Sequence, residues 1–503
     1  MTVHVNKKAA LLLVLVLASL MMIALVKCRA ELQPLSNLKD AATYLWTFRT
    51  AGYTVSSPII AGDLLYVHSG YPGSATAILY CVNASSGTQV WNRTSLFEPF
   101  TVANGYLFVA GSTYEGPFPL NLQGVVSCLN AETGDQIWNY SYGYFIDTPI
   151  VNGDVVYVSG FNVTSTGGNA GFVFALNALT GGKIWGYTGP EGTRLGNLVL
   201  VGSNLYTSSG FYSEEGRSWN SAVYKLNGST GEEMWNYSKS GFFSSLAFLG
   251  QNVYVSSDFV NTTTFVDSGN ISGTVYQGGI LDLNASDGTK IWDYQINSSV
   301  ESLSVVNNIV SAVSGEGTVY AFNAFDGRRV WINPTGLTTG YALLVNNSLY
   351  VGYSGGVICL DAGNGGVIWN FKAGDFADSY ATNPTYDDGV VFVGWNGPTT
   401  FSPIIVHSFY AVNSFTGERL WSYPLDYSVN SAPLVVNGTA YIGGSFVTNE
   451  SPDNLGPGAV IALKSNVNAL PPEFPWLLVA IAAVVVAAVV VVSAVMYLKK
   501  RKR

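Results

Sequence analysis

The side chains that could carry out acid–base or metal chemistry are few in this chain. Three histidines occur among 503 residues, and one of them, His4, precedes a long apolar segment. His68 and His407 alone are too few for a histidine metal cluster, and nothing in their surroundings marks a catalytic triad. The histidines therefore predict neither a metal site nor a triad hydrolase.

Acidic residues occur in segments that we expect to be loops, at Glu214-Glu215, Asp375, Asp378 and Asp387-Asp388. No spacing singles out a pair for general acid–base catalysis, so we interpret them as exposed loop charge. Trp219 and Trp395 lie outside the repeat described below. Each either lines a face pocket, where it stacks on a sugar, or is an ordinary packing residue. We assign no catalytic and no metal-binding residue.

The charge balance argues against nucleic acid as a partner. Charged residues make up 11% of the chain, and the formal net charge is −9. Nine basic residues lie near the termini, so residues 31–474 keep 14 basic and all 32 acidic residues, a net charge of −18. A sparsely charged, acidic surface repels nucleic acid and suits a cell envelope.

The elements that would position any site are built from one repeated pattern, a tryptophan preceded by a turn. The tryptophans are Trp46, Trp91, Trp138, Trp185, Trp235, Trp292, Trp331, Trp369 and Trp421. All but the first have Asn or Asp eight residues earlier and Gly four residues earlier: Gly87, Gly134, Gly181, Gly231, Gly288, Gly327, Gly365 and Gly417. The spacing between successive tryptophans is 38 to 57 residues, which brackets the period of a β-propeller blade.

Each position in the pattern has a physical role. The Asn or Asp side chain can bond the backbone ahead of it and start a turn, and the Gly supplies a positive φ. The Trp that follows on the next strand is predicted to wedge between neighbouring blades. Two further strands with a Gly-containing turn precede each such hairpin, as in residues 57–70 and 148–160, so each unit has four strands.

The two ends of the repeat region complete each other. Residues 45–48 form a fourth strand with no blade before it, and residues 458–464 form a third strand with no tryptophan strand after it. Pairing them would close the ring and remove its sheet edges. The sequence therefore predicts an all-β propeller over residues 42–465 with nine four-stranded blades, or eight if the weak unit around residues 302–313 is miscounted.

Three cysteines fall within this register. Cys81, Cys128 and Cys359 occupy the position where other copies have alanine, and we interpret them as small strand residues. A disulfide between Cys81 and Cys128 would join neighbouring blades at equal register, which is too far. Lys225 and Asp282 share the same position, so we expect it not to be buried in every blade.

The motif resembles the pyrroloquinoline-quinone (PQQ)-like β-propeller repeat, most closely at VYAFNAFDGRRVW (residues 319–331) and FYAVNSFTGERLW (residues 409–421). The resemblance implies the propeller fold, usually with eight blades. It leaves the function open, because the family includes quinone-dependent alcohol and glucose dehydrogenases as well as non-enzymatic scaffolds of outer-membrane assembly. The adjacent cysteines and the CxxCH haem motif of many of these dehydrogenases do not occur here. PQQ and Ca²⁺ are implied by the resemblance only, and we predict no cofactor.

Both termini have features of a membrane protein. Residues 1–30 form a signal peptide or an uncleaved signal anchor. Residues 466–475 form a Pro-rich linker, residues 476–498 a transmembrane helix and residues 499–503 a basic cytoplasmic tail. This C-terminal arrangement resembles the anchors of archaeal surface proteins.

Sequons for N-glycosylation agree with export to the cell surface. The candidate sites are Asn92, Asn139, Asn162, Asn236, Asn261, Asn270, Asn297, Asn346, Asn437 and Asn449. We expect a cell-membrane protein whose propeller lies on the extracellular side and binds or scaffolds envelope proteins or glycans. The alternative is a PQQ- and Ca²⁺-dependent dehydrogenase of alcohols or sugars with a divergent site.

Overall fold

The computed structural model describes most of the repeat region. The described residues are 42–52, 54–70, 76–96, 100–115, 121–163, 168–213, 218–261, 275–335, 339–374, 379–397, 407–429, 431–447 and 455–466. The expected signal segment, linker, membrane span and basic tail lie outside them. No helix among these residues is long and apolar enough to cross a membrane.

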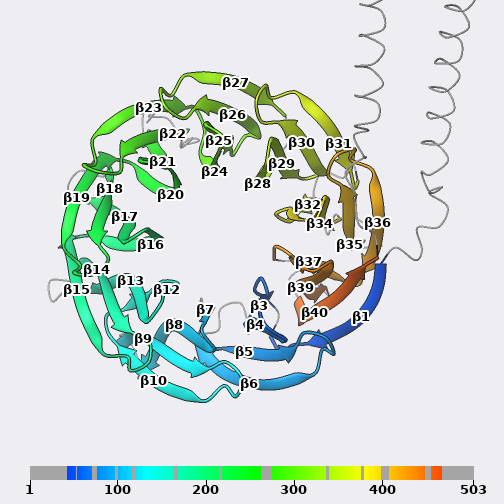
Figure 1. Ribbon diagram of the computed structural model, residues 1–503, viewed down its shortest axis with the longest axis horizontal. Helices are drawn as coiled ribbons and strands as arrows, with labels where there is room; N and C mark the ends of the chain where they lie inside the picture. The colour runs from blue at the N-terminus through cyan, green and yellow to red at the C-terminus, as the bar shows by residue number, and fades with distance from the viewer. Residues whose placement is uncertain are drawn as a thin grey trace, which may run out of the picture. The chain divides into compact units, whose positions relative to one another are not determined.

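The described strands form nine antiparallel sheets arranged in a ring (Figure 1). We number the blades along the chain. Blade 1 comprises β2 (Thr54–Val55), β3 (Ile59–Ala61), β4 (Leu64–Gly70), β5 (Thr76–Asn83) and β6 (Gln89–Leu96). Blade 2 comprises β7 (Phe100–Ala103), β8 (Tyr106–Glu115), β9 (Asn121–Asn130) and β10 (Gln136–Ser141). Blade 3 comprises β11 (Phe145–Ile146), β12 (Ile150–Asn152), β13 (Val155–Val163), β14 (Asn169–Asn177) and β15 (Lys183–Glu191).

The next three blades follow the same plan. Blade 4 comprises β16 (Arg194–Val201), β17 (Asn204–Ser213), β18 (Ser218–Asn227) and β19 (Glu233–Ser240). Blade 5 comprises β20 (Phe242–Leu249), β21 (Asn252–Asn261), β22 (Val275–Asn284) and β23 (Lys290–Ile296). Blade 6 comprises β24 (Val300–Val306), β25 (Ile309–Ser314), β26 (Thr318–Asn323) and β27 (Arg329–Pro334).

The last three blades complete the ring. Blade 7 comprises β28 (Thr339–Val345), β29 (Ser348–Tyr353), β30 (Gly356–Asp361) and β31 (Val367–Lys372). Blade 8 comprises β32 (Tyr380–Ala381), β33 (Thr385–Asp387), β34 (Val390–Asn396), β35 (His407–Asn413) and β36 (Arg419–Leu425). Blade 9 comprises β37 (Tyr427–Val429), β38 (Leu434–Val436), β39 (Thr439–Val447), β40 (Leu455–Ser465) and the N-terminal β1 (Ala42–Arg49).

Strands from the two ends of the repeat region close the ring, as the sequence predicts. β1 pairs antiparallel with β40, from Ala42 opposite Ser465 to Arg49 opposite Ala459. The weak unit that includes β24 and β25 is a complete blade. The propeller therefore has nine blades, and the eight-blade alternative is wrong.

The two faces of the ring carry different connections. On one face of the ring, a two-residue turn precedes the second strand of every blade, as at residues 62–63 and 437–438. On the same face, a five-residue turn joins the third and fourth strands in each of blades 1 to 8, as at residues 84–88. We call this the turn face. Connections on the opposite side, the loop face, vary in length from the single residue Gly241 to residues 262–274. Because β1 begins and β40 ends beside the short turns, both ends of the propeller leave from the turn face.

Each seam between blades depends on one tryptophan. The indole of Trp292 in blade 5 lies against Gly327 in the turn of blade 6, where a Cβ would be 2.5 Å from its Cδ2 atom. Its Nε1 donates a hydrogen bond to the carbonyl oxygen of Ala324 in the same turn, at 3.1 Å. The eight repeat glycines all have positive φ and all lie against the tryptophan of the preceding blade. Each buried indole contributes about 2–3 kcal/mol of apolar burial.

The same carbonyl often accepts a second hydrogen bond. Tyr254 of blade 5 donates its hydroxyl to Ala324 O at 3.0 Å, beside Trp292. The closing blade uses this arrangement too, because Trp46 and Tyr441 both donate to Ala84 O. At the last seam Trp421 donates instead to the Ser465 hydroxyl, at 3.1 Å, because blade 9 lacks the glycine turn. The hydrophobic core is therefore a series of clusters, each lying between two neighbouring blades. One such cluster contains Trp185 of blade 3 with Leu205 and Leu226 of blade 4.

The seam contact makes a quantitative prediction about glycine. Gly327→Ala combines a left-handed φ with a clash against Trp292, whereas Gly105→Ala has a similar φ of +79° and open space around its Cβ. We expect Gly105→Ala to lower the free energy of unfolding by about 1–2 kcal/mol. Gly327→Ala should lose about 1–3 kcal/mol more, because the indole must shift. Denaturant unfolding of both variants measures the difference, and equal losses would show that the glycine serves only the turn.

Candidate functional site

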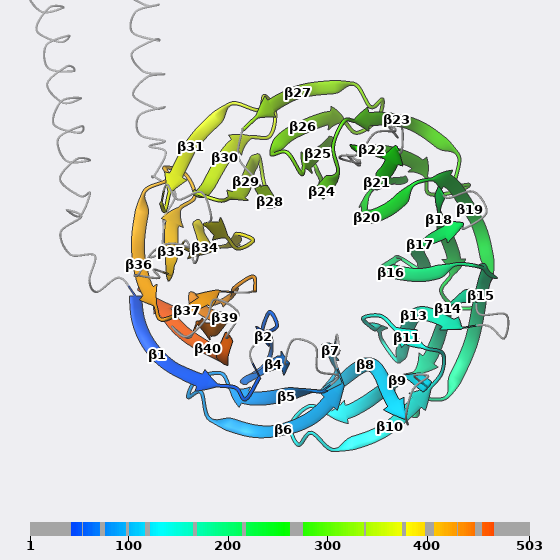
Figure 2. The same cartoon turned by 180° about the vertical axis from the view of Figure 1, so that it is seen from behind.

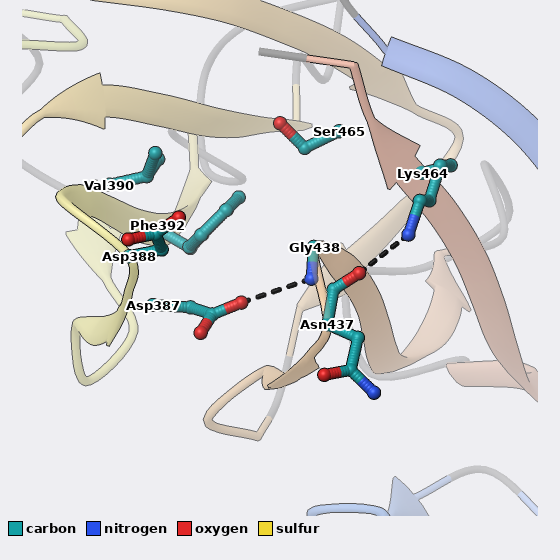
Figure 3. A pocket seen from close by; sticks show the side chains of 8 residues that line it. All are labelled: Asp387, Asp388, Val390, Phe392, Asn437, Gly438, Lys464 and Ser465. Carbon is teal, nitrogen blue, oxygen red and sulfur yellow. Dashed lines mark hydrogen bonds between the residues drawn. The ribbon is translucent and has the colours of Figure 1, made fainter. Parts of the chain in front are cut away.

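A pocket of about 240 Å³ lies on the turn face where blade 8 meets blade 9 (Figure 3). Its lining residues are Asp387, Asp388, Val390, Phe392, Asn437, Gly438, Lys464 and Ser465. It forms at the point where β40 ends without a following glycine turn. The pocket is thus a product of how the ring closes.

Two hydrogen bonds involve the polar groups that line this pocket. Gly438 N donates to Asp387 Oδ2 at 3.0 Å, and Lys464 Nζ donates to Asn437 O at 2.5 Å (Figure 3). Asp388 occupies a turn position with a φ of 41°. The Asp387 bond joins blade 8 to blade 9, whereas the Lys464 bond lies within blade 9. They supply a structural link rather than an evident reaction centre.

The expectation for Lys225 and Asp282 is wrong. Lys225 is 6% exposed and Asp282 is 0% exposed, so the register position is buried even where it is charged. Lys225 Nζ reaches across the seam and donates to Ala285 O at 2.6 Å, and burial lowers its pKa. Lys225 is thus a third donor to Ala285 O, which also accepts hydrogen bonds from Trp235 and Tyr206. A small residue at position 225 could not reach this carbonyl.

Asp282 is a buried carboxyl group with incomplete hydrogen bonding. Its Oδ2 accepts a hydrogen bond from Asn252 Nδ2 at 2.6 Å, and among the described residues its Oδ1 has no partner. Burial raises its pKa from 3.8 to about 7, against a smaller lowering by the Asn252 hydrogen bond. The group is therefore about half protonated near neutral pH.

Among the described cysteines and histidines, all are buried within blades except His68, which is half-buried. Cys81, Cys128 and Cys359 are free and buried. Burial raises their pKa values to about 12, 11 and 12, which keeps the thiols protonated. Burial lowers the pKa of His68 and of His407 to about 4, so both rings are neutral at pH 7. Among the described residues, no group of three His, Cys, Asp or Glu side chains is placed to hold a metal ion.

The two tryptophans outside the repeat and the acidic loop residues do not form a site among the described residues. Trp395 is only 3% exposed and donates to Ser354 O at 3.2 Å, so it packs within the protein and the sugar-stacking alternative is wrong for it. The side chain of Trp219, and residues Glu214, Glu215, Asp375 and Asp378, lie outside what the structure describes. The described residues therefore do not supply the carboxylate set that the family resemblance implies for Ca²⁺.

The sequon asparagines divide by location. Asn92, Asn139 and Asn236 are exposed on the outermost strands β6, β10 and β19, directly after a seam tryptophan. Asn297, Asn346 and Asn437 are also exposed, and Asn162 is half-buried. The side chain of Asn261, together with Asn270 and Asn449, lies outside the described part of the chain. By contrast, the turn sequons Asn83, Asn227 and Asn284 use their Oδ1 atoms to accept backbone N–H groups.

The loop face carries a group of exposed and half-buried aromatic side chains that the repeat pattern does not single out. Phe145 begins β11 and is 47% exposed, and its ring stacks on that of Phe161 with centroids 5.8 Å apart. Tyr144 packs on the same ring at 5.7 Å. Arg194, which begins β16 in the next blade, places its Cζ 4.4 Å from the Phe161 centroid. The guanidinium thus bridges blades 3 and 4 by a cation–π contact.

Blade 5 extends this group. Phe242 begins β20 and is 43% exposed. Its ring lies over Gly210, the cross-strand partner of Arg194, where a Cβ would be 2.8 Å from Phe242 Cε2. We call Tyr144, Phe145, Phe161, Arg194 and Phe242 the aromatic strip. It follows the inner strands of three consecutive blades, β11, β16 and β20, which Figure 2 shows on the inner side of the ring.

A sequence signal for the strip exists. Residues 140–145 read YSYGYF, a local concentration of aromatics just after a seam tryptophan. Whether the side chains of such a run are buried or exposed depends on where the first strand of the blade begins relative to the neighbouring blades. The run alone could not separate these outcomes.

Comparison with known proteins supports the repeat assignment. A family model described as outer membrane protein assembly factor BamB matches residues 75–333, 219–381 and 315–399. The assembly factor BamB of Taylorella asinigenitalis is 32% identical over 127 residues, 24% of this chain and 33% of the relative. Tetrathionate hydrolase of Acidithiobacillus ferrooxidans is 23% identical over 250 residues, 44% of this chain and 49% of the relative. The chain thus matches less than half the length of either relative.

Among solved structures, the quinohemoprotein alcohol dehydrogenase of Comamonas testosteroni matches with a TM-score of 0.50 at 13% identity. The match covers 86% of this chain and 77% of that enzyme. Likeness at this level of identity concerns the fold alone.

Asp282 predicts an unusual dependence of stability on pH. Below its unfolded pKa both states are protonated, and the buried carboxyl carries no ionisation cost. As pH rises from about 4 to 7 the unfolded chain ionises while the folded chain retains the proton, so stability falls. The loss reaches at most about 4 kcal/mol, since one pKa unit corresponds to about 1.4 kcal/mol.

Asp282→Ala, which restores the alanine of other blades, and Asp282→Asn, which cannot ionise, should both remove this loss. Relative to wild type they should gain stability at pH 8 and gain little at pH 4. Chemical unfolding at the two pH values measures the effect. An unchanged pH profile in both variants would contradict the assignment of the raised pKa to Asp282.

Proposed function

We propose that this chain, which belongs to the family described as outer membrane protein assembly factor BamB, is a membrane-anchored extracellular propeller that binds or scaffolds envelope components. The basic residues 499–503 would lie in the cytoplasm and residues 476–498 would span the membrane. The nine-bladed ring would then be held outside the cell by its C-terminal end.

The observation that carries this proposal is the exit of both propeller ends from one face. Ala42 and Ser465 are cross-strand partners, and Asn466 Nδ2 donates to Thr43 Oγ1 at 2.8 Å just beyond them. The linker of residues 466–475 could span at most about 35 Å when extended. An anchor attached through this linker would hold the turn face toward the bilayer and leave the loop face free.

The connections on the two faces fit such a division. Short turns of constant length on the turn face leave little room for variation, whereas the loop face has connections of varied length. Binding residues are disproportionately found on variable loops carried by a rigid scaffold. The exposed sequons on β6, β10 and β19 would lie at the outer rim, away from both faces.

The alternative is a PQQ- and Ca²⁺-dependent dehydrogenase, and a titration separates the two roles. Calorimetric titration of the purified chain with PQQ, with and without Ca²⁺, should show no Ca²⁺-dependent binding if the protein is a scaffold. Tight Ca²⁺-dependent binding would contradict the scaffold role and would justify a screen of alcohols and sugars by dye reduction.

The anchor makes a prediction about fractionation. The full chain should stay in the membrane fraction after alkaline carbonate extraction, and a chain ending at residue 475 should be released, because it lacks the apolar span. A chain that lacks only residues 499–503 is the matched control and should stay in the membrane.

Two outcomes would contradict this arrangement. Extraction of the full chain by carbonate would exclude a membrane anchor. Retention of the shortened chain in the membrane fraction would indicate that residues 1–30, and not residues 476–498, anchor the protein.

A further inference from the structure

We propose that the aromatic strip on the loop face is a binding site for a neutral carbohydrate chain. The proposal rests on the proposed function, since it names a ligand for the face that the anchor leaves free. Its observations are the exposed rings of Phe145 and Phe242 and the guanidinium of Arg194 between them. These three residues begin the first strands of blades 3, 4 and 5.

The chemistry of the strip matches a sugar polymer. A pyranose ring has a flat face of C–H groups that packs on an aromatic ring, and hydroxyl groups around its edge. Phe145 is held flat by stacking on Phe161 with an interplanar angle of 24°, so its exposed surface is fixed before any ligand arrives. Arg194 presents up to five N–H donors, and hydroxyl oxygens can accept hydrogen bonds from them.

The strip is built rather than incidental. Arg194 lies over Phe161, which fixes the position of the guanidinium without an acidic partner. Among the ion pairs of the described residues, none includes Arg194. Gly210 leaves the space that the Phe242 ring fills, since a Cβ there would meet the ring at 2.8 Å. Single exposed apolar residues need no explanation, but here Phe145, Arg194 and Phe242 stand at equivalent positions of three adjacent blades.

Other ligand classes fit less well. The net charge of −18 over residues 31–474 repels nucleic acids and acidic polysaccharides. A folded protein partner would need a broad, well-packed interface, whereas the strip offers two exposed rings, those of Phe145 and Phe242. A bilayer would contact the opposite face, from which the chain ends leave. A neutral glycan that crosses several blades satisfies these limits.

The test uses the purified full chain in detergent with three probes: cellohexaose and mannohexaose as neutral chains, and hexagalacturonate as an acidic chain. Calorimetry should show binding of at least one neutral chain and weaker binding of the acidic chain. Phe145→Ala, Phe242→Ala and Arg194→Gln should each raise the dissociation constant about tenfold, because each removes a stacking surface or a donor group.

Phe415→Ala is the matched control, because Phe415 is 43% exposed like Phe242 but lies in a five-residue turn on the turn face. It should bind as the wild type does. Absence of binding to both neutral chains, preference for the acidic chain, or an equal effect of Phe242→Ala and Phe415→Ala would each overturn the proposal. The binding assay does not depend on a membrane, so a negative binding result contradicts the glycan proposal without affecting the anchor proposal. A negative fractionation result likewise contradicts the anchor proposal without affecting the binding measurement.

Discussion

The contact of each tryptophan with the turn of the next blade is the constraint on which this propeller depends. An indole can approach a backbone so closely only where the residue beneath it has no side chain, and glycine also adopts the left-handed φ of that turn at little steric cost. The indole nitrogen is buried by the contact and needs an acceptor, which the turn carbonyl provides. One five-residue turn thus shapes its own hairpin and receives the neighbouring blade.

Much of the architecture was predictable because the seam is encoded locally. The spacing of Asn, Gly and Trp lies within nine residues, so blade count and ring closure can be read without knowing any long-range contact. The closing strand pair followed from a third strand with no fourth strand after it at one end and a fourth strand with no blade before it at the other. The absence of a glycine turn after β40 also changes the partner of Trp421 from a carbonyl to the Ser465 hydroxyl.

Burial and exposure were less predictable, because they depend on neighbouring blades. Lys225 was expected to be accessible as a charged residue, but its aliphatic chain crosses the seam and its ammonium group reaches a backbone acceptor. Trp395 lies outside the repeat register and is nevertheless buried, since Ser354 of blade 7 accepts its N–H group. The aromatic strip was missed because Phe145 and Phe242 stand at strand starts, where the sequence pattern does not show which side faces solvent.

The departures from the repeat gather in one part of the ring. Lys225 and Asp282 replace the small seam residue in blades 4 and 5, and the aromatic strip crosses blades 3, 4 and 5. A buried carboxyl with an oxygen that lacks a partner costs stability, and other blades avoid it with alanine or cysteine. Natural proteins depart from their local rules mainly where another requirement competes with stability. Lys225 contacts the turn carbonyl of Ala285, and Asp282 contacts Asn252 beside the next short turn, so these two departures change the seams at the turn face, opposite the aromatic strip.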